Sequence, residues 1–236
     1  MSTAGEGDDT VSVMSWTERA ADRSPLMQQS RSRNVRQMRI MVDAARRLIA
    51  QKGSGFTTQE LAREAGVALQ TFYRHFGGKD QLLLAALEDM HAEHAVAYEE
   101  AARGIASPLD RLRFYITLAL SGLDEAGPGA MTPQFITAEH WRLHQLFPQD
   151  TMHATQPTVD LFARELRAAQ EQGLLTRTDA TRSAELMVMI VRTVYHHYAF
   201  VPKTEPAEQI AGQVWEFCLS GIGGRGEGRD GAPSAQ

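Results

Sequence analysis

Apolar side chains recur at steps of three and four along most of this chain, which is the pattern of helices with one buried face. The first such run has its apolar positions between Val35 and Ile49 and ends near Gly53. Later runs predict helices over residues 79–103, 108–123, 133–147, 157–172, 179–200 and 206–220. Proline stands at or near four of these starts, where its missing N–H costs no hydrogen bond. No segment alternates apolar and polar residues over a useful strand length, so we expect an all-α fold.

Two short helices at a tight turn are predicted between the first run and the helix at 79–103. Thr58 opens the first of them, and Gly66 ends it because glycine takes the left-handed conformation of a helix stop at little cost. Val67 plugs the turn, and the second helix runs from about Ala68 to Phe76. This is the layout of a helix-turn-helix, whose second helix enters a DNA major groove.

Charge is distributed unevenly along the chain. Between Arg31 and Lys79 there are ten Lys or Arg and three acids, so this segment carries +7. The whole chain carries −5, which leaves −12 for the remaining residues. A basic segment on an acidic protein is typical of a nucleic-acid-binding module joined to a body that does not touch nucleic acid.

The residues around this turn resemble a known family. Residues 73–82 read Tyr-Arg-His-Phe-Gly-Gly-Lys-Asp-Gln-Leu, and they follow Thr57, Thr58 and the turn formed by Leu61, Ala62, Ala65, Gly66 and Val67. Together they resemble the DNA-binding domain of TetR-family transcriptional regulators over about residues 34–90. The resemblance is specific, because several constrained positions agree in register. It implies a three-helix helix-turn-helix domain at 34–80 and a helical ligand-binding and dimerisation domain at 81–220.

The resemblance also implies which side chains contact DNA. The expected phosphate contacts are Thr58, Tyr73, His75 and Lys79. The side chains expected to face base edges are Leu69, Gln70, Thr71 and Arg74. Phe72 and Phe76 lie four apart and are expected in the core. A helix-turn-helix that mediates only protein contacts is the alternative interpretation.

The chain departs from the common pattern of the family at two positions. Ala68 stands where a Ser or Thr often caps the recognition helix, and the missing cap costs about 1 kcal/mol of local helix stability. Gln70 stands where a small residue is common. Because the amide oxygen and the amide nitrogen of Gln can both hydrogen-bond one adenine, Gln70 is a candidate for sequence readout.

The ends of the chain and its cellular setting follow from composition. Residues 1–33 and 221–236 are polar or Gly-rich with little apolar periodicity, so we expect a disordered arm and a disordered tail. Cys218 is the only cysteine, which excludes an intrachain disulfide and suits a reducing cytosol. No apolar run approaches the roughly 20 residues that cross a bilayer, and the N-terminus lacks a signal-peptide apolar core. We expect a cytoplasmic protein without a membrane partner.

Two of the predicted helices favour a subunit interface. In 157–172, Val159, Phe162, Leu166 and Ala169 form one apolar stripe. Residues 183–200 hold only Glu185 and Arg192 as formal charges, so this helix must be covered on more than one side. A four-helix contact between two copies satisfies that need, and the resemblance places the dimer interface there. A core helix of a monomer is the alternative.

Met and aromatic side chains recur on the faces of the body helices that are expected to point inward. Such side chains usually form a hydrophobic core. In the family that the chain resembles, the helices after the fourth enclose a ligand cavity, so Met and aromatic walls with a few polar tips become candidates for a mainly apolar effector. The expected effector contacts are Tyr115, Phe135, Trp141, His144, Met187 and Tyr195.

Histidine spacing raises the possibility of a metal, and other motifs bear on catalysis. His140 and His144 are four apart on one helix face, and His91 and His94 are three apart on another helix. A pair four apart can share a metal, but no third ligand is placed by spacing, so we expect no metal and no cofactor. No phosphate loop, nucleophile elbow or paired-carboxylate signature stands out, so we expect no enzyme.

These observations predict a ligand-responsive transcriptional regulator. We expect a homodimeric repressor that binds a palindromic DNA operator and is released by a small, mainly apolar molecule. A metal-responsive regulator that uses the histidines of the body, or an activator, is the alternative. The sequence defines neither the operator nor the identity of the effector.

Overall fold

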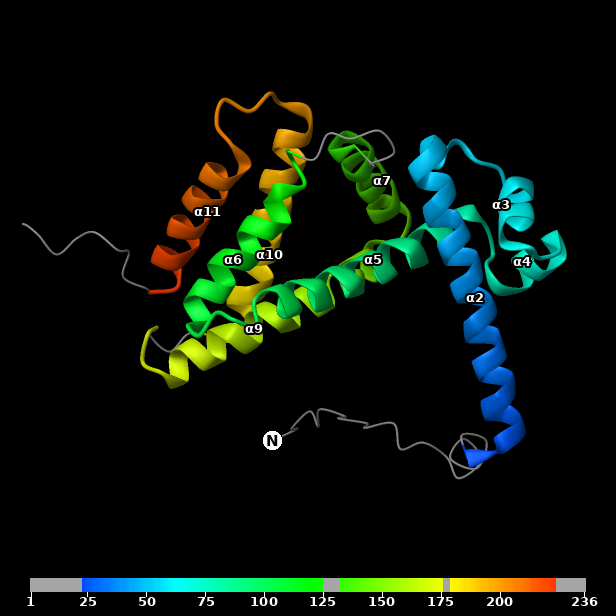
Figure 1. The fold of residues 1–236 in the computed structure, drawn as a ribbon, viewed down its shortest axis with the longest axis horizontal. Helices are drawn as coiled ribbons and strands as arrows, with labels where there is room; N and C mark the ends of the chain where they lie inside the picture. The colour runs from blue at the N-terminus through cyan, green and yellow to red at the C-terminus, as the bar shows by residue number, and fades with distance from the viewer. Residues whose placement is uncertain (1–22, 125–131, 176–178, 224–236) are drawn as a thin grey trace, which may run out of the picture.

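The computed structural model describes residues 23–124, 132–175 and 179–223, and over these ranges it is helical without strands, which confirms the all-α prediction (Figure 1). The helices are α2 (Pro25–Lys52), α3 (Thr58–Ala65), α4 (Leu69–His75), α5 (Lys79–Ala101), α6 (Pro108–Ser121), α7 (Pro133–Leu146), α8 (Pro148–Ala154), α9 (Gln156–Glu171), α10 (Ala180–Phe200) and α11 (Ala207–Gly221), with one 3-10 turn, η1 (Gly53–Gly55), after α2. Within the described ranges, every helix is too short or too polar to cross a bilayer.

Helix α2 begins earlier than the boundary expected at residue 34. Pro25 occupies its first turn, and the buried residues start only at Met41. Residues 25–40 are almost all exposed, so Met, Gln and Arg hold this part helical through intrinsic propensity and without burial. A search for buried periodicity cannot find such a segment. Residues 1–22 of the expected arm and residues 224–236 of the expected tail lie outside the described residues.

A short helix, α8, was not predicted. Phe147 has φ −137° and ψ 65°, which ends α7, and Pro148 then opens α8 in the next turn. A segment of only 7 residues is too short to show a helical period. The other predicted helices are present, with ends shifted by one or two residues.

A first hydrophobic core lies among α2, α3, α4 and the first half of α5. Its fully buried side chains include Met41, Leu61, Phe72 and Leu82, one from each of these helices. Leu143 of α7 also belongs to this core, although α7 lies far along the chain in the body. Figure 1 shows α2, α3 and α4 together at one end of the molecule, with α7 beside them.

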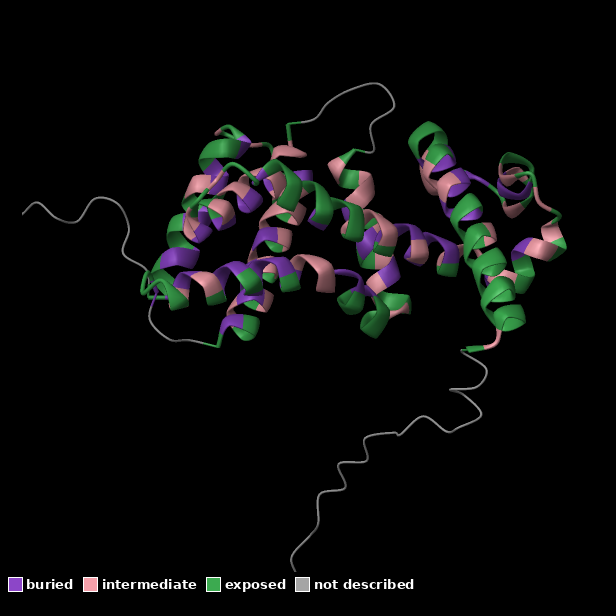
Figure 2. Cartoon of the chain, turned by 60° about the horizontal axis from the view of Figure 1, so that its bottom comes forward, coloured by how far each residue is buried: buried purple, intermediate pink, exposed green. Residues whose placement is uncertain are grey.

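A second core lies among the second half of α5 and α6, α9, α10 and α11. Leu112 and Tyr115 of α6 pack there with Phe162 of α9, Met187 of α10 and Trp215 of α11. Figure 2 shows buried residues (purple) recurring along the helices of the body, between exposed residues (green). Helix α5 therefore supplies buried side chains to both cores and connects the two ends of the molecule.

A buried ion pair stabilises the join between α6 and α9. Glu165 is 4% exposed and accepts hydrogen bonds from Arg111 Nε at 2.8 Å and pairs with its Nη2 at 2.7 Å. The same guanidinium donates to the carbonyls of Ile105 and Ala106. Because a buried charge must be paired and hydrogen-bonded, these contacts hold the loop before α6 against α9.

The apolar stripe of α9 does not face a second subunit, and here the prediction was wrong. Val159, Phe162 and Leu166 are all buried inside the chain itself, in the second core. An apolar stripe shows that one face is covered, but the covering surface here comes from α6 and α10 of the same chain. Large apolar side chains stay exposed on α10 instead, at Leu186 and Met189.

Candidate DNA-binding surface and interior cavity

Helix α3 is fixed at its first turn by a capping box. The Thr57 hydroxyl accepts the backbone N–H of Glu60 at 3.2 Å, and the Glu60 carboxylate accepts the backbone N–H of Thr57 at 2.8 Å. Lys52 donates to the same carboxylate at 2.6 Å. These bonds hold the pKa of Glu60 at about 2, with the Lys52 hydrogen bond as the largest cause. The carboxylate is therefore charged at neutral pH and joins the end of α2 to the start of α3.

The turn between α3 and α4 has the predicted geometry. Gly66 takes φ 67° and ψ 30°, the left-handed conformation, and its N–H bonds the carbonyls of Ala62 and Arg63. Val67 N–H donates to Ala62 O at 2.9 Å. These bonds satisfy the last carbonyls of α3 and set the direction of α4.

Helix α4 buries one side and exposes the other. Phe72 is fully buried and anchors the helix on the first core, and Ala68 precedes it without a side-chain cap, as predicted from sequence. The polar side chains of the other side are open to solvent: Gln70, Tyr73 and Arg74 are exposed, and Thr71 and His75 are partly exposed. Of the side chains expected to face base edges, Gln70, Thr71 and Arg74 are therefore accessible, whereas Leu69 packs partly against the first core.

Two of the expected phosphate contacts hold α4 against its neighbours. The Tyr73 hydroxyl lies 3.3 Å from the hydroxyl of Thr58 at the start of α3. His75 Nε2 lies 2.9 Å from Gln37 Oε1 on α2. Tyr73 is still 52% exposed, so its hydroxyl is accessible to a phosphate oxygen. These two contacts hold the Tyr73 and His75 side chains in place before DNA binds, so less conformational entropy is lost on binding.

Lys79 has a structural role that the sequence did not reveal. Its ammonium donates to the carbonyls of Ser54 and, at 2.7 Å, of Phe56, and it lies 4.5 Å from the centroid of the Phe56 ring. An ammonium has three donors, so one donor is left for a phosphate. Lys79 thus ties the start of α5 to the loop before α3.

Several cations of the basic segment are already paired with carboxylates. Arg47 bonds Glu64 within the segment, whereas Arg39 and Arg46 bond Asp89 on α5. Because the carboxylates on α5 lie outside the segment, the charge available to DNA is smaller than +7. Arg74 on α4, one of the side chains expected to face base edges, is exposed.

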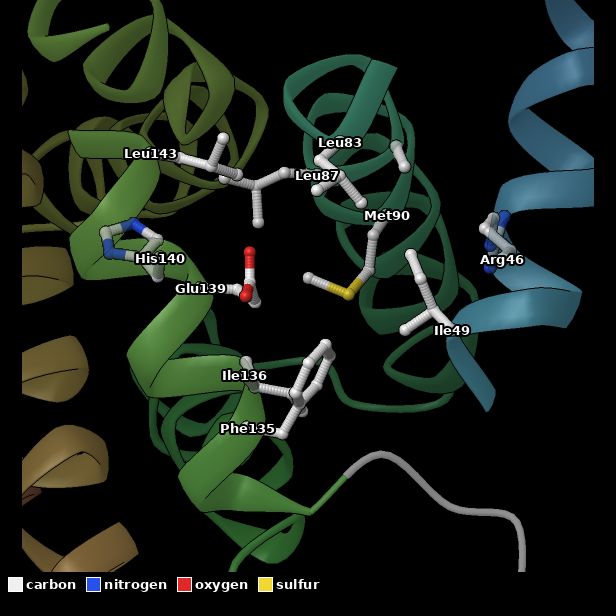
Figure 3. Close-up of a pocket in the computed structure, with 11 residues that line it drawn as sticks. Arg46, Ile49, Leu83, Leu87, Met90, Phe135, Ile136, Glu139, His140 and Leu143 are labelled. Carbon is white, nitrogen blue, oxygen red and sulfur yellow. The ribbon is translucent and has the colours of Figure 1, made fainter. Parts of the chain in front are cut away.

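A cavity of about 60 Å³ lies where the first core meets the body (Figure 3). Helices α2, α5 and α7 line it with Arg46, Ile49, Leu83, Ala86, Leu87, Met90, Phe135, Ile136, Glu139, His140 and Leu143. A single water needs roughly 10–15 Å³, so the cavity as it stands holds only a very small molecule. A larger ligand would have to separate α7 from α5 or α2.

Helix α7 also contacts the DNA-binding end directly. The ring of Phe135 lies 3.3 Å from the position that a Cβ would occupy at Gly53, the residue that follows α2. Gly53 has a positive φ of 62°, so a larger residue there would be both strained and crowded. At the other end of the contact, Arg142 bonds Asp80 in the first turn of α5 at 2.7 Å. A shift of α7 is therefore passed to the loop and helix that position α3 and α4.

Beside the cavity, three helices bring together a group of cationic and imidazole side chains. We call it the α5–α7–α10 cluster, and its members are His91, Thr137, His140, Arg192 and His196. Burial, with the charge of Arg192 as a smaller cause, lowers the pKa of His140 to about 3. Burial, followed by His94 and Arg192, lowers the pKa of His91 to about 4. The rings of His140 and His196 lie 5.1 Å apart. At neutral pH these imidazoles are uncharged.

The predicted effector contacts are scattered in the structure. Phe135 alone among them lines the cavity. Tyr115 and Met187 pack in the second core, and Tyr195 packs against it. Trp141 is 55% exposed, and His144 Nδ1 lies 2.9 Å from the Thr151 hydroxyl. Sequence reasoning missed the α2 and α5 walls of the cavity, because these residues match a core pattern in their own helices.

The spacing of the histidines on α7 does not produce a metal site within the described ranges. The rings of His140 and His144 lie 6.4 Å apart and nearly parallel, so their nitrogens do not converge on one point. No group of three His, Cys, Asp or Glu residues in the described part of the chain is arranged to hold a metal ion.

We predict that Lys79→Ala destabilises the fold and also weakens DNA binding. Loss of two hydrogen bonds from a charged donor is expected to cost about 1–3 kcal/mol of unfolding free energy, measured by denaturant titration. Loss of one phosphate contact should weaken binding to all DNA sequences and lower the salt slope by about one unit. Lys52→Ala, which breaks only an exposed pair, is the control and should cost less than about 1 kcal/mol. Unchanged stability of Lys79→Ala would contradict the structural role.

We also predict a loss of stability between pH 7 and pH 5. The pKa values of His91 and His140 are about 4 and about 3 in the fold, and about 6.5 in an unfolded chain. As the pH falls below about 6.5, the unfolded chain takes up protons that the folded chain does not, so stability drops. The expected loss is about 2–4 kcal/mol for the two histidines together.

Denaturant titrations at pH 7, 6 and 5 measure this loss. His140→Gln should remove about half of it, whereas His153→Gln, at an exposed position on α8, should leave it unchanged. A wild-type stability that stays constant from pH 7 to pH 5 is the result that rules out buried, neutral imidazoles.

Comparison with known proteins agrees with the geometry of the DNA-binding end. Residues 41–86 match the model of the bacterial regulatory proteins of the tetR family. The transcriptional regulator BetI of Brucella anthropi is 29% identical over 166 residues, which cover 68% of this chain and 80% of BetI.

Solved structures show the same fold over most of the chain. FadR of Thermus thermophilus, a TetR-family repressor solved with lauroyl-CoA, gives a TM-score of 0.64 at 19% identity and covers 83% of this chain and 100% of its own. RolR in complex with resorcinol gives 0.58 at 17% identity and covers 79% and 89%. The helix-turn-helix of this chain is thus a TetR-family DNA-binding domain, and it is joined to a helical body with the fold of TetR-family regulators.

Proposed function

We propose that this protein is a cytoplasmic repressor that binds a palindromic operator as a homodimer and is released by a small molecule held in its body. The observation that carries the proposal is the contact of α7 with both ends of the molecule. One side of α7 lines the interior cavity, and Phe135 and Arg142 of the same helix contact the DNA-binding end. A molecule that moves α7 therefore changes the position of the recognition helix.

The exposed side of α4 supports a division of labour at the DNA. Gln70 and Arg74, with Leu69 and Thr71 beside them, are the proposed base contacts. Arg prefers the acceptors of guanine and Gln prefers adenine, so both side chains can distinguish base pairs in the major groove. Thr58, Tyr73, His75 and Lys79 are the proposed phosphate contacts. Phosphate contacts set register, and base contacts set sequence preference.

Exposed apolar side chains on α10 and α11 support a dimer. Leu186 is 44% exposed, Phe200 61% and Phe217 69%. Isolated exposed apolar residues are ordinary, but several large ones on two neighbouring helices mark an interaction surface. A second copy would cover them by a twofold contact, and it would set two recognition helices about one DNA turn apart.

Release would follow from a shift between two states of the dimer. A ligand can shift this equilibrium only if it binds one state more tightly than the other. In the described structure the cavity is too small for most ligands, so a bound molecule would favour a state in which α7 stands farther from α2 and α5. FadR with lauroyl-CoA and RolR with resorcinol are relatives of this fold that hold small molecules.

A randomised operator library tests the DNA-binding proposal. The wild-type protein is expected to select an inverted repeat. Gln70→Ala should relax the preference at one or two base pairs of each half-site, at a cost of about 1–3 kcal/mol on the best site. Gln145→Ala, at an exposed position on α7, makes the same substitution away from the DNA-binding surface and is the control that should keep the preference. A wild-type protein that selects no repeat would refute the proposal, and a uniform loss by Gln70→Ala would refute only its base contact.

A second prediction separates the dimer surface from the core. Phe217→Asp should produce a folded monomer in sedimentation velocity, because the side chain is exposed in the single chain and an unpaired charge in a dry interface is unfavourable. Its operator affinity should fall steeply. Phe162→Asp, at a position that is 1% exposed, should instead unfold or aggregate the protein. A Phe217→Asp protein that remains a dimer would rule out this surface.

A further inference from the structure

Arg192 is a partly buried cation among uncharged imidazoles. Burial is the main cause that lowers the pKa of His91 on α5, of His140 on α7 and of His196 on α10, and the charge of Arg192 on α10 contributes to all three shifts. The rings of His140 and His196, one turn after Arg192, lie 5.1 Å apart. Positive charge and imidazole nitrogens thus occur together in this part of the body.

No carboxylate of the described residues neutralises Arg192. Burial alone lowers the pKa of its guanidinium, whereas a neighbouring carboxylate would raise it, as Glu93 and Asp89 raise the pKa of Arg46. A cation that is partly removed from water is stabilised by an anionic partner. Within the described ranges no carboxylate supplies that partner, so the guanidinium of Arg192 is open to an anion from outside the chain.

Three polar atoms around Arg192 also lack hydrogen-bond partners. They are Nε2 of His91, Nε2 of His140 and the hydroxyl of Thr137, all fully buried. Thr137 is 1% exposed and His140 is 7% exposed. More than 90% of buried polar groups in proteins are hydrogen-bonded, so three orphaned groups in one place require an explanation. A ligand with acceptor oxygens satisfies all three, since each group can donate.

The cluster adjoins the cavity through α5 and α7. His140 belongs to both, and Figure 3 shows its ring at the wall beside Leu143. The hydroxyl of Thr137 and Nε2 of His91 lie on the same two helices but outside the cavity lining. A ligand whose acceptor group bonds His140 can therefore extend an apolar chain into the cavity.

Glu139 does not serve as the missing counter-charge. Its side chain lines the cavity, but its Oε2 already accepts Arg142 Nε at 3.1 Å and Nη2 at 3.0 Å. The cavity wall thus carries a neutralised carboxylate, and the net positive charge of the site stays on Arg192.

We propose that the effector is a small monocarboxylic acid whose carboxylate binds Arg192, His91, His140 and Thr137. Its apolar part lies in the cavity, against Leu87, Met90 and Leu143. The inference rests on the proposed function, because it names the chemical class of the molecule that the body binds. A carboxylate provides the two oxygens that a guanidinium bonds in parallel, and it cancels the buried charge.

Three probes with an unbranched chain of six carbons, which in hexanoate includes the carboxyl carbon, test the head group. Hexanoate, hexan-1-ol and hexyltrimethylammonium differ in charge, and isothermal titration calorimetry gives the affinity of the full-length protein for each. Hexanoate is expected to bind at least tenfold more tightly than the alcohol, and the ammonium compound should not bind measurably. Equal affinities, or a preference for the cation, would overturn the proposal.

Arg192→Met is the decisive variant, because it removes the charge and keeps an apolar stem of similar length. Without ligand, its melting temperature should rise slightly or stay the same, since an unpaired and partly buried charge has been replaced by an apolar group. Its affinity for hexanoate should fall at least tenfold, to that of hexan-1-ol, while the affinity for the alcohol stays within twofold. Arg182→Met on the same helix, which breaks only the exposed pair with Glu185, is the matched control and should change neither quantity.

The outcomes separate this inference from the proposed function. If the wild type binds its operator but hexanoate binds Arg192→Met as tightly as wild type, the carboxylate site is wrong and the regulator remains. If hexanoate binds as expected but no operator is selected, the proposed function fails and the site remains. If Arg192→Met changes sedimentation without changing hexanoate affinity, Arg192 pairs with a second copy of the chain, and the inference fails.

Discussion

The structure depends on the burial that α5 and α7 share with the DNA-binding end. The first half of α5 supplies Leu82 and Leu87 to the first core, and its second half supplies Ala95 to the second. Leu143 of α7 adds a body helix to the first core. Cores are close-packed, so these helices cannot shift without repacking both ends. The recognition helix α4 is therefore not an independent module on a linker.

This arrangement explains where polar groups are placed. Arg142 of α7 pairs with Asp80 of α5, and Arg46 of α2 pairs with Asp89 of α5. Because exposed ion pairs contribute little free energy, these pairs mainly align α7 and α2 along α5. The α5–α7–α10 cluster lies on the body side of α7 and keeps its positive charge unpaired within the described ranges. An anion there would stabilise one position of α7, which is the helix that contacts Gly53 and α5.

Sequence reasoning recovered the helices and the helix-turn-helix, because these are set by local signals: the apolar period, the prolines and Gly66. It could not predict contacts between helices that are far apart in the sequence. The stripe of α9 shows a covered face but not its partner, which proved to be the chain's own core. The phosphate contact of Lys79 stays a prediction, but its structural bonds could not be predicted, because nothing local shows that Ser54 and Phe56 turn their carbonyls toward it. The cluster around Arg192 was missed because its members come from three helices, whereas spacing relates histidines only within one.

Hydrogen exchange of the full chain tests the coupling between the two ends most directly. Leu143→Ala removes the α7 side chain from the first core, whereas Leu166→Ala removes one of similar size from the second core. We predict that Leu143→Ala lowers amide protection in the second half of α2 and in α3 and α4, as well as in α7. Leu166→Ala should lower protection in the body and leave α3 and α4 unchanged. Equal protection of α3 and α4 in wild type and Leu143→Ala would contradict the account, because α7 would then have no hold on the DNA-binding end.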